Sequence, residues 1–192
     1  TVLVVGAGGV GINAVQGARH AGASHIIVAD PNGRRADLAR QVGATHFVST
    51  VPEAASLAMA LNPTARGVDV AIVCVADTDP TTVRQAFDAT GKAGTVVLAS
   101  LSNDFDALSI QLPGAALVVS ERKIVGTLMG STNPAWDIPL LIRLYRSGQL
   151  ELDSLITQRY SLSDINVGFG DMVSGANTRG VIEHGWRTPD GP

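Results

Sequence analysis

The residues with the clearest chemical use are a run of glycines close to the start of the chain. Gly6, Gly8 and Gly11 fit the pattern G-x-G-x-x-G, directly after an apolar run and at the start of a helical pattern. The first glycine permits a tight turn, the second lets the backbone approach a pyrophosphate, and the third lets the helix pack closely on the strand. Free N–H groups at the helix start, where the dipole is positive, would hold the anion. The segment, which includes Gly9 and Val10, predicts a dinucleotide site, although a glycine run alone also suits an ordinary turn.

A carboxylate follows at the spacing that this motif requires. Asp30 ends the second apolar run, 19 positions beyond Gly11. An acidic side chain there accepts hydrogen bonds from the adenosine ribose hydroxyls and repels the 2′-phosphate of NADP. Two other interpretations of this segment remain open. Residues 30–33 (DPNG) also form a good turn alone, and Arg34 and Arg35 are either solvated charges or ligands of a 2′-phosphate. On balance the sequence favours NAD over NADP.

A parallel sheet is needed to position these residues. Most apolar runs are apolar on consecutive residues, which suits parallel strands covered on both faces. The predicted strands are Val2–Val5, His25–Ala29, Thr45–Val48, Val68–Val75, Thr95–Ala99 and Lys123–Leu128, and the predicted helices between them cover residues 9–21, 33–42, 52–61 and 80–90. This alternation predicts an α/β fold with a doubly wound parallel Rossmann sheet.

The pattern changes after Met129. A loop over residues 130–134 (GSTNP) precedes a predicted helix over 136–147, a strand over 155–160, a helix over 163–174 and a last strand over 180–183. A segment of this size does not form a secure core alone. The sequence therefore predicts a dinucleotide-binding domain over residues 1–129 and a C-terminal segment, 130–192, that completes a different domain.

Composition excludes several classes of function. Hydrophobic residues make up 45% and charged residues 16% of the 192 residues, which suits a packed globular core. The formal net charge is -3 without a Lys/Arg cluster, so we expect no nucleic-acid partner. The longest apolar runs are too short to span a bilayer, so we expect no membrane association and a cytoplasmic location. The chain starts on apolar residues without Met or a signal peptide, as a piece of a longer protein would.

Neither a metal site nor a catalytic residue is predicted within the chain. Cys74 is the only cysteine, which rules out a disulfide within the chain and a cysteine-based zinc site. It lies in an apolar run and is predicted to be a small buried side chain. The four histidines, His20, His25, His46 and His184, are scattered along the chain, and we interpret them as structural or surface residues.

From Val2 to about Glu183 the chain resembles the C-terminal half to two-thirds of a zinc-type medium-chain alcohol dehydrogenase. The stretches 4–11 (VVGAGGVG), 38–45 (LARQVGAT) and 123–131 (KIVGTLMGS) are typical of that family, as is the tail from Asp137 to Ile182. Many folds share the glycine loop, whereas its combination with this tail is more specific. The nearest resemblance is to actinobacterial members that oxidise simple alcohols or thiol-conjugated formaldehyde.

The resemblance implies a role for each of several residues. Asp30 would bind the adenosine ribose with Arg35 beside it, and Val75 would pass near the adenosine. Leu98 and Ala99 would line the nicotinamide, Met129 would lie near its ribose, and Arg179 would reach the pyrophosphate. The full set of expected cofactor-binding residues is Gly6, Gly8, Gly9, Val10, Gly11, Asp30, Arg35, Val75, Leu98, Ala99, Met129 and Arg179.

The family's chemistry is hydride transfer between an alcohol or aldehyde and NAD, with zinc polarising the substrate oxygen. The zinc ligands of the family, usually two cysteines and a histidine, come from an N-terminal catalytic half that this chain lacks. Residues 130–192 would be an incomplete part of that catalytic domain. We therefore expect the isolated chain to bind NAD and to be inactive. The resemblance also implies a homodimer or homotetramer joined along an edge strand around Leu117–Val119.

Two other classes of protein stay open. A zinc-free, quinone-type medium-chain reductase has a similar nucleotide domain, but such enzymes usually prefer NADPH, against which Asp30 argues. A non-enzymatic nucleotide-binding module would bind cofactor without any zinc in the parent protein. A short-chain dehydrogenase is excluded, because no Tyr-x-x-x-Lys pair is present: Gln149 follows Tyr145 and Asp164 follows Tyr160 at that spacing.

Overall fold

The computed structural model describes residues 1–61, 64, 67–100 and 109–184. The chain divides into two compact units, Thr1–Leu150 and Glu151–Pro192. The predicted domain boundary at residues 129 and 130 stays a prediction.

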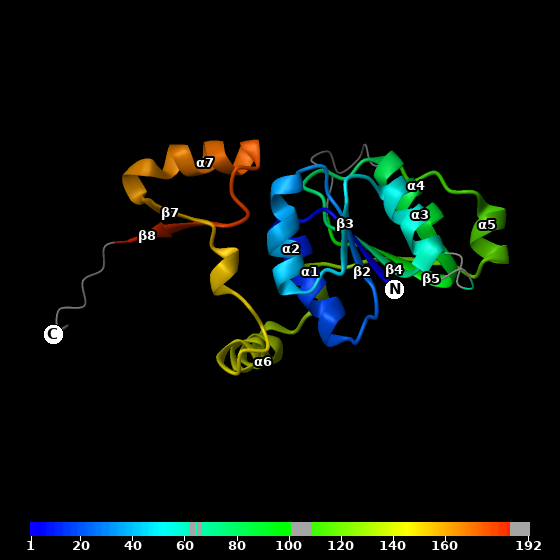
Figure 1. Ribbon diagram of the computed structural model, residues 1–192, viewed down its shortest axis with the longest axis horizontal. Helices are drawn as coiled ribbons and strands as arrows, with labels where there is room; N and C mark the ends of the chain where they lie inside the picture. Colours follow the sequence, from blue (N-terminus) through cyan, green and yellow to red (C-terminus); the bar gives the residue numbers. More distant parts are fainter. Residues whose placement is uncertain (62–63, 65–66, 101–108, 185–192) are drawn as a thin grey trace. The chain divides into compact units, whose positions relative to one another are not determined.

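The first unit is built around a six-stranded parallel sheet (Figure 1). Its strands lie in the order β3-β2-β1-β4-β5-β6. This is the doubly wound order in which the chain reverses direction across the sheet between β1 and β4. The predicted α/β Rossmann fold is therefore confirmed. The strand bounds are β1 Val2–Val5, β2 Ile26–Ala29, β3 His46–Val48, β4 Val68–Val73, β5 Thr90–Leu98 and β6 Lys123–Gly126.

Helices cover both faces of this sheet. Helices α1 and α2 lie on one face, and α3, α4 and α5 lie on the other (Figure 1). The bounds are α1 Gly9–His20, α2 Ala36–Val42, α3 Val51–Leu61, α4 Pro80–Ala89, α5 Gly114–Val119 and α6 Pro134–Arg146, with short 3₁₀ turns η1 Gly33–Arg35 and η2 Met129–Ser131. The core between the sheet and α3 and α4 includes Phe87 and Ala58, both fully buried. Two-sided coverage explains why the strands are apolar on consecutive residues.

The predicted edge strand around Leu117–Val119 is wrong. These residues form the end of helix α5, and β6 is the outer strand of the sheet. Pro113 lies at the helix N-cap, and its carbonyl oxygen accepts a hydrogen bond from the backbone N–H of Leu117 at 3.1 Å. Leu117 packs on the core, whereas Val118 and Val119 are exposed. Packing of the helix on the sheet thus outweighs the strand preference of the two β-branched residues.

The second unit holds the small two-stranded sheet. Strand β7 Gln158–Ser161 pairs in parallel with β8 Gly180–Glu183, and helix α7 Ile165–Ser174 connects them through the 3₁₀ turn η4 Leu162–Asp164. A preceding 3₁₀ turn, η3, covers Asp153–Leu155. The Tyr160 hydroxyl donates to Asp171 Oδ2 at 2.7 Å and accepts from Asn177 Nδ2 at 3.0 Å, so it ties β7 to α7 and to the approach of β8.

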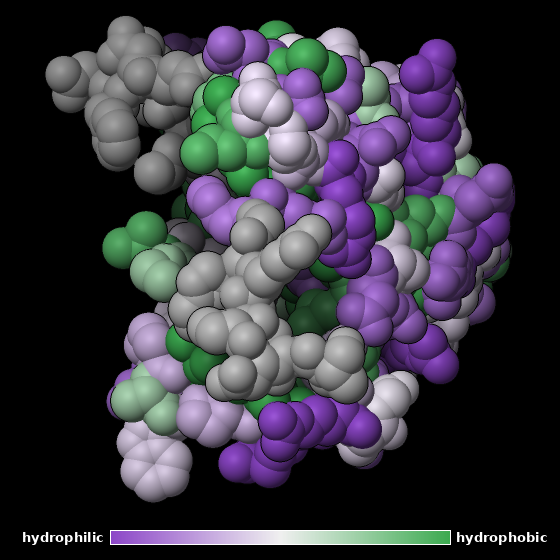
Figure 2. All heavy atoms as spheres, turned by 90° about the vertical axis from the view of Figure 1, so that its left-hand side faces the viewer, coloured by the Kyte–Doolittle hydropathy of each residue, from purple (hydrophilic) through white to green (hydrophobic). Residues whose placement is uncertain are grey.

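Apolar side chains remain on the surface of both units. In α7 the exposed ones include Val167, Phe169 and Val173, and Figure 2 shows apolar side chains on the side of the molecule that it faces. In α6 Trp136 and Ile138 are exposed as well. Every helix in the described part of the chain is nevertheless too short or too polar to cross a bilayer.

Candidate functional site

A cavity of about 950 Å³ opens at the carboxyl ends of the parallel strands. In open α/β sheets this edge binds ligands, at the point where the strand order reverses. The volume lies within the range of about 300–1,000 Å³ that is usual for cofactor and drug-sized ligands. Most of the predicted cofactor-binding residues line it, namely Gly6, Gly8, Gly9, Val10, Asp30, Arg35, Val75 and Ala99.

Two glycines of the loop are required by the packing of the protein itself. Gly6 has φ +91°, and a Cβ atom there would lie 3.1 Å from the backbone carbonyl of Cys74 on the neighbouring chain segment. A Cβ atom on Gly11 would lie 1.8 Å from the carbonyl oxygen of Gly6. Gly11 is buried in α1 and does not line the cavity. These two positions therefore shape the turn between β1 and α1.

Gly8 differs, because nothing in the part of the protein that the structure describes requires a glycine there. Its backbone has φ −74° and ψ −170°, which any residue adopts, and a Cβ atom would have no neighbour within 4 Å. Gly8 lines the cavity, so the open space around it belongs to the candidate site. A missing side chain at this position gives a ligand close access to the backbone.

The start of helix α1 lines the same space, and no side chain of the described residues caps its N–H groups. Gly8 is the N-cap and offers no side-chain oxygen, and the first turn carries no acidic residue. The N–H of Ile12 makes the first helical hydrogen bond, to the Gly8 carbonyl oxygen at 3.0 Å. The N–H groups of Gly9, Val10 and Gly11 precede it at the positive end of the helix dipole, an arrangement that suits an anion.

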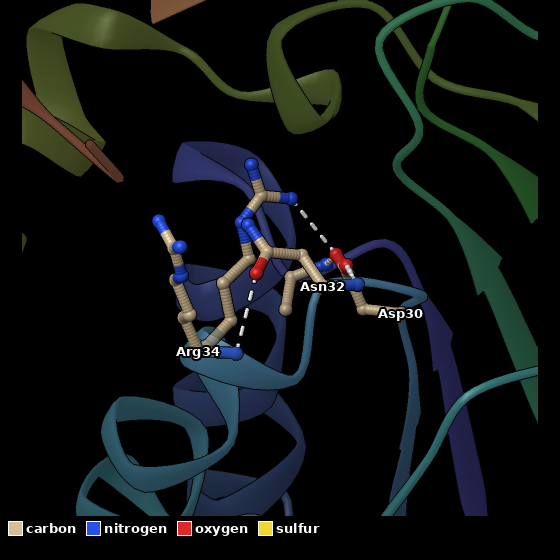
Figure 3. Close-up of polar contacts among 5 residues, drawn as sticks. Asp30, Asn32 and Arg34 are labelled. Atoms are coloured by element: carbon tan, nitrogen blue, oxygen red, sulfur yellow. Dashed lines mark hydrogen bonds and ion pairs between the residues drawn. The ribbon is translucent and has the colours of Figure 1, made fainter. Parts of the chain in front are cut away.

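Asp30 is 3% exposed and stands at the centre of a hydrogen-bond network (Figure 3). Its Oδ2 atom accepts from the backbone N–H of Ala7 at 2.7 Å and from Arg35 Nη1 at 2.9 Å, and its Oδ1 atom accepts from the N–H of Asn32 at 2.7 Å. A carboxylate accepts about four hydrogen bonds, so roughly one position remains for a ligand hydroxyl.

The two arginines after Asp30 lie differently. Arg35 forms an ion pair with Asp30, and its Nε atom is buried without a partner in the described part of the chain. The N–H of Arg34 donates to Asn32 Oδ1 at 3.2 Å, and its side chain points away from the Asp30 carboxylate (Figure 3). An unsatisfied buried donor costs about 1–3 kcal/mol, which a ligand acceptor in the cavity would relieve.

The opposite wall of the cavity follows β4 and β5. Cys74 lines it, and burial raises the pKa of the thiol to about 11, so this side chain stays protonated at neutral pH. Thr78 is 3% exposed, and its hydroxyl oxygen lies 2.5 Å from that of Ser100. The Ser100 hydroxyl donates to the Val73 carbonyl oxygen at 3.3 Å. This wall is therefore fixed by contacts between the two strand ends.

Asp77, Asp79 and Thr82 also line the cavity, although they were not predicted from the sequence. Asp79 is the N-cap of α4, where Oδ1 accepts from the N–H groups of Thr81 at 2.8 Å and Thr82 at 3.0 Å, and Oδ2 accepts from the Thr82 hydroxyl at 2.5 Å. These hydrogen bonds, chiefly those from Thr82, lower the pKa of Asp79. The available signal was a helix-capping Asp-Pro pair in the short segment between a buried strand and the next helix.

Three further predicted residues lie outside the cavity lining. Leu98 ends β5 and packs on the core, and Met129 is 76% exposed in η2 with φ 49°. Arg179 belongs to the second unit, where its carbonyl oxygen accepts from the N–H of Thr157 at 3.0 Å. The cofactor roles of these three residues stay predictions, as do those of the residues that line the cavity.

The part of the chain that the structure describes contains no cluster of potential metal-ligating side chains. Its residues contain no group of three or more His, Cys, Asp or Glu side chains that could hold a metal ion. His25 and His46 form a pair with ring centroids 5.9 Å apart, at the start of β2 and β3 and thus at the opposite edge of the sheet from the cavity. The described residues therefore do not fit a catalytic zinc.

Comparison with known proteins gives consistent matches. The family model for zinc-binding dehydrogenases matches residues 9–145. An NDMA-dependent alcohol dehydrogenase from Amycolatopsis methanolica is 43% identical over 184 residues, which are 96% of this chain and 49% of that protein. Alcohol dehydrogenase B from Mycobacterium tuberculosis is 37% identical over 183 residues, 95% of this chain and 48% of that protein.

Among solved structures, benzyl alcohol dehydrogenase from Acinetobacter calcoaceticus matches with a TM-score of 0.84 and 29% identity. The match covers 95% of this chain and 49% of that one. The chain thus spans about half the length of the curated relatives that it matches.

Proposed function

The chain belongs to the zinc-binding dehydrogenase family, and from that membership we propose that it is the NAD-binding portion of an alcohol dehydrogenase. The resemblance indicated by the sequence, including its actinobacterial character, is confirmed. The observation that carries the proposal is the joint presence of an uncompensated helix start, an open Gly8 and a buried Asp30 in one cavity.

The cofactor's pyrophosphate would lie against the N–H groups of Gly9 and Val10, where Gly8 leaves room for close approach. The adenosine ribose would donate a hydroxyl hydrogen bond to Asp30. The nicotinamide would extend toward Val10 and Ala99, with Val10 59% exposed and able to cover one face of the ring. Two observations support the fit: the space around Gly8 and the unpartnered Nε donor of Arg35 in the described residues.

When bound, NAD would accept the hydride, and the zinc that the family resemblance implies, held outside this chain in the complete protein, would polarise the alcohol oxygen. The residues of this chain would bind and orient the cofactor and exclude water from one side of it. Small-molecule alcohols or aldehydes are the proposed substrates of the complete protein. A homodimer or homotetramer, implied by the family, and a cytoplasmic location are likewise proposals.

Asp30 supports a preference for NAD over NADP. Its carboxylate is buried and forms an ion pair with Arg35, so the positive charge of the guanidinium is already balanced by Asp30 before a 2′-phosphate arrives. A phosphate in this place would add about two negative charges beside a fixed carboxylate. We therefore propose that NADP binds considerably more weakly than NAD.

A fluorescence titration of the chain with NADH, and in parallel with NADPH, tests the proposal. We expect saturable NADH binding and much weaker NADPH binding. Tight binding of NADPH alone would contradict the cofactor assignment and favour the zinc-free reductase class. Absence of binding by both, with a folded chain by circular dichroism, would contradict the proposed nucleotide site itself.

A further inference from the structure

The loop after β4, residues Val75–Asp79, carries two carboxylates on the cavity side. Asp77 and Asp79 line the cavity, while Thr78 between them is turned inward and is 3% exposed. The contact between the hydroxyl oxygens of Thr78 and Ser100, at 2.5 Å, fastens the middle of this loop to the end of β5. Anchoring of the central residue leaves its two neighbours facing the cavity.

We propose that Asp77 and Asp79 form a second acidic wall, across the cavity from Asp30, that selects against a phosphorylated adenosine. The inference rests on the proposed function, because it requires the adenosine end of the cofactor to lie in this cavity. Asp30 follows β2 and the loop follows β4, with β1 between the two strands. Two strand spacings amount to about 10 Å, and Asp30 and the loop line the same cavity, so an adenosine beside Asp30 would lie between the carboxylate that follows β2 and the loop that follows β4.

The charge balance of the cavity supports this role. Its lining contains Asp30, Asp77 and Asp79, and among the described lining residues Arg35 is the basic one. Arg35 is engaged by Asp30 at 2.9 Å. The hydrogen bonds that cap α4 keep Asp79 ionised at neutral pH. The charged side chains of the described lining therefore sum to a negative charge, which disfavours a 2′-phosphate, whereas the unphosphorylated cofactor adds no charge at that position.

This second wall makes a prediction that Asp30 alone does not. If Asp30 were the single determinant, its neutralisation would abolish the discrimination between the two cofactors. With the second acidic wall, part of the discrimination between NADH and NADPH remains after Asp30 is neutralised. Neutralising Asp77 or Asp79 in a chain that keeps Asp30 also weakens this discrimination. Like charges at about 10 Å interact weakly in water, so each carboxylate should contribute a factor of roughly three at low ionic strength.

The experiment compares Asp77→Asn, Asp79→Asn and the double variant with the unaltered chain. Asparagine is a good N-cap residue, so Asp79→Asn keeps the start of α4 while it removes the charge. Asp88→Asn is the matched control, since Asp88 lies on the same helix and pairs with Arg84 on the surface at 2.8 Å. The dissociation constants of NADH and NADPH are measured by fluorescence at low and high salt.

We expect the ratio of the NADPH to the NADH dissociation constant to fall roughly threefold for each single variant and roughly tenfold for the double variant at low salt. The effect should shrink at about 0.5 M salt, where charges are screened over a few ångströms. The control should keep the ratio of the unaltered chain. Circular dichroism checks folding, and Asp79→Ser supplies a second neutral cap.

An unchanged ratio in the double variant, with NADH binding intact, would overturn the second wall and leave the proposed function standing. A similar fall of the ratio in Asp88→Asn would also overturn it, because the effect would then follow net charge rather than position. Failure of the unaltered chain to bind NADH would overturn both proposals.

Discussion

Ala7 donates its backbone N–H to Oδ2 of Asp30 at 2.7 Å, so one buried carboxylate joins the glycine loop to the end of β2. The same oxygen accepts from Arg35, and the other oxygen holds the N–H of Asn32. Asp30 therefore stabilises the fold through hydrogen bonds within the protein, independently of any ligand. Loop geometry, ion pairing and the proposed ribose contact all depend on a single side chain.

Replacing Asp30 by Asn should reduce both stability and cofactor affinity. Only one side-chain oxygen would remain, so either the Ala7 N–H or the Asn32 N–H would lose its acceptor and Arg35 would lose its ion partner. An unsatisfied buried donor costs about 1–3 kcal/mol, and loss of a hydrogen bond to a charged group should weaken NADH binding at least about tenfold. Urea unfolding and an NADH titration measure the two effects.

Asp37→Asn is the matched control for that substitution, because Asp37 is exposed and pairs with Arg40 on the surface at 3.2 Å. It should leave the free energy of unfolding and NADH affinity close to those of the unaltered chain. Unchanged stability in Asp30→Asn would show that the network around the carboxylate does not support the loop.

The glycines of the loop should separate into two classes on substitution by alanine. Gly6→Ala should destabilise the chain by about 1–3 kcal/mol, because an L side chain is strained at φ +91° and would press on the Cys74 carbonyl. Gly8→Ala should change stability little, because the new methyl group meets nothing within 4 Å and the loss of a glycine N-cap offsets the gain from a less flexible unfolded chain. It should nevertheless weaken NADH binding roughly tenfold by keeping the pyrophosphate from the backbone.

Gly17→Ala is the control within the same helix, since a Cβ atom there also meets nothing within 4 Å and the residue lies in the middle of α1. It should raise stability by about 0.5–1 kcal/mol without any change in NADH affinity. Equal NADH affinity in Gly8→Ala and Gly17→Ala would argue against pyrophosphate binding at Gly8.

Burial of Cys74 predicts a loss of stability in alkaline solution. The pKa of the thiol rises from 9.0 to about 11 in the folded chain, so the folded state holds the proton more tightly than the unfolded state. The contribution is complete below pH 9 and is lost as the pH rises from 9 toward 11. The difference in free energy of unfolding between the chain and Cys74→Ala isolates this effect from other titrating groups. A difference that stays constant across the range would contradict it.

Much of this molecule could be predicted from local patterns. The strands were recognisable because coverage on both faces makes them continuously apolar, and the spacing from Gly11 to Asp30 reflects one β-α-β unit whose ends meet at one edge of the sheet. Helix α5 could not be recognised, because its Val118 and Val119 favour a strand locally and only contacts of the helix with the distant sheet decide the outcome.

The site was less predictable than the fold. Asp77 and Asp79 are positioned by the contact of Thr78 with Ser100, which is 22 residues away along the chain. No local sequence pattern predicts that contact. The expected roles of Met129 and Arg179 came from resemblance alone. Each depends on how residues beyond the Rossmann sheet approach the cofactor, which the spacing of residues in one sequence does not encode.

Zinc dependence should differ between this chain and a polypeptide of the relatives' full length. The described residues offer no group of three metal-ligating side chains, and the single cysteine is a buried, protonated thiol, which is a poor zinc ligand. The purified chain should therefore bind NADH equally well before and after treatment with a chelator, and it should not oxidise simple alcohols.

A polypeptide extended to the length of the relatives should contain about one zinc ion or more per chain and should lose alcohol oxidation on chelation. Metal analysis with an alcohol oxidation assay distinguishes the alternatives. Activity in the 192-residue chain would place the catalytic groups within it, and a zinc-free, active extended protein would move the assignment to the quinone-type reductases.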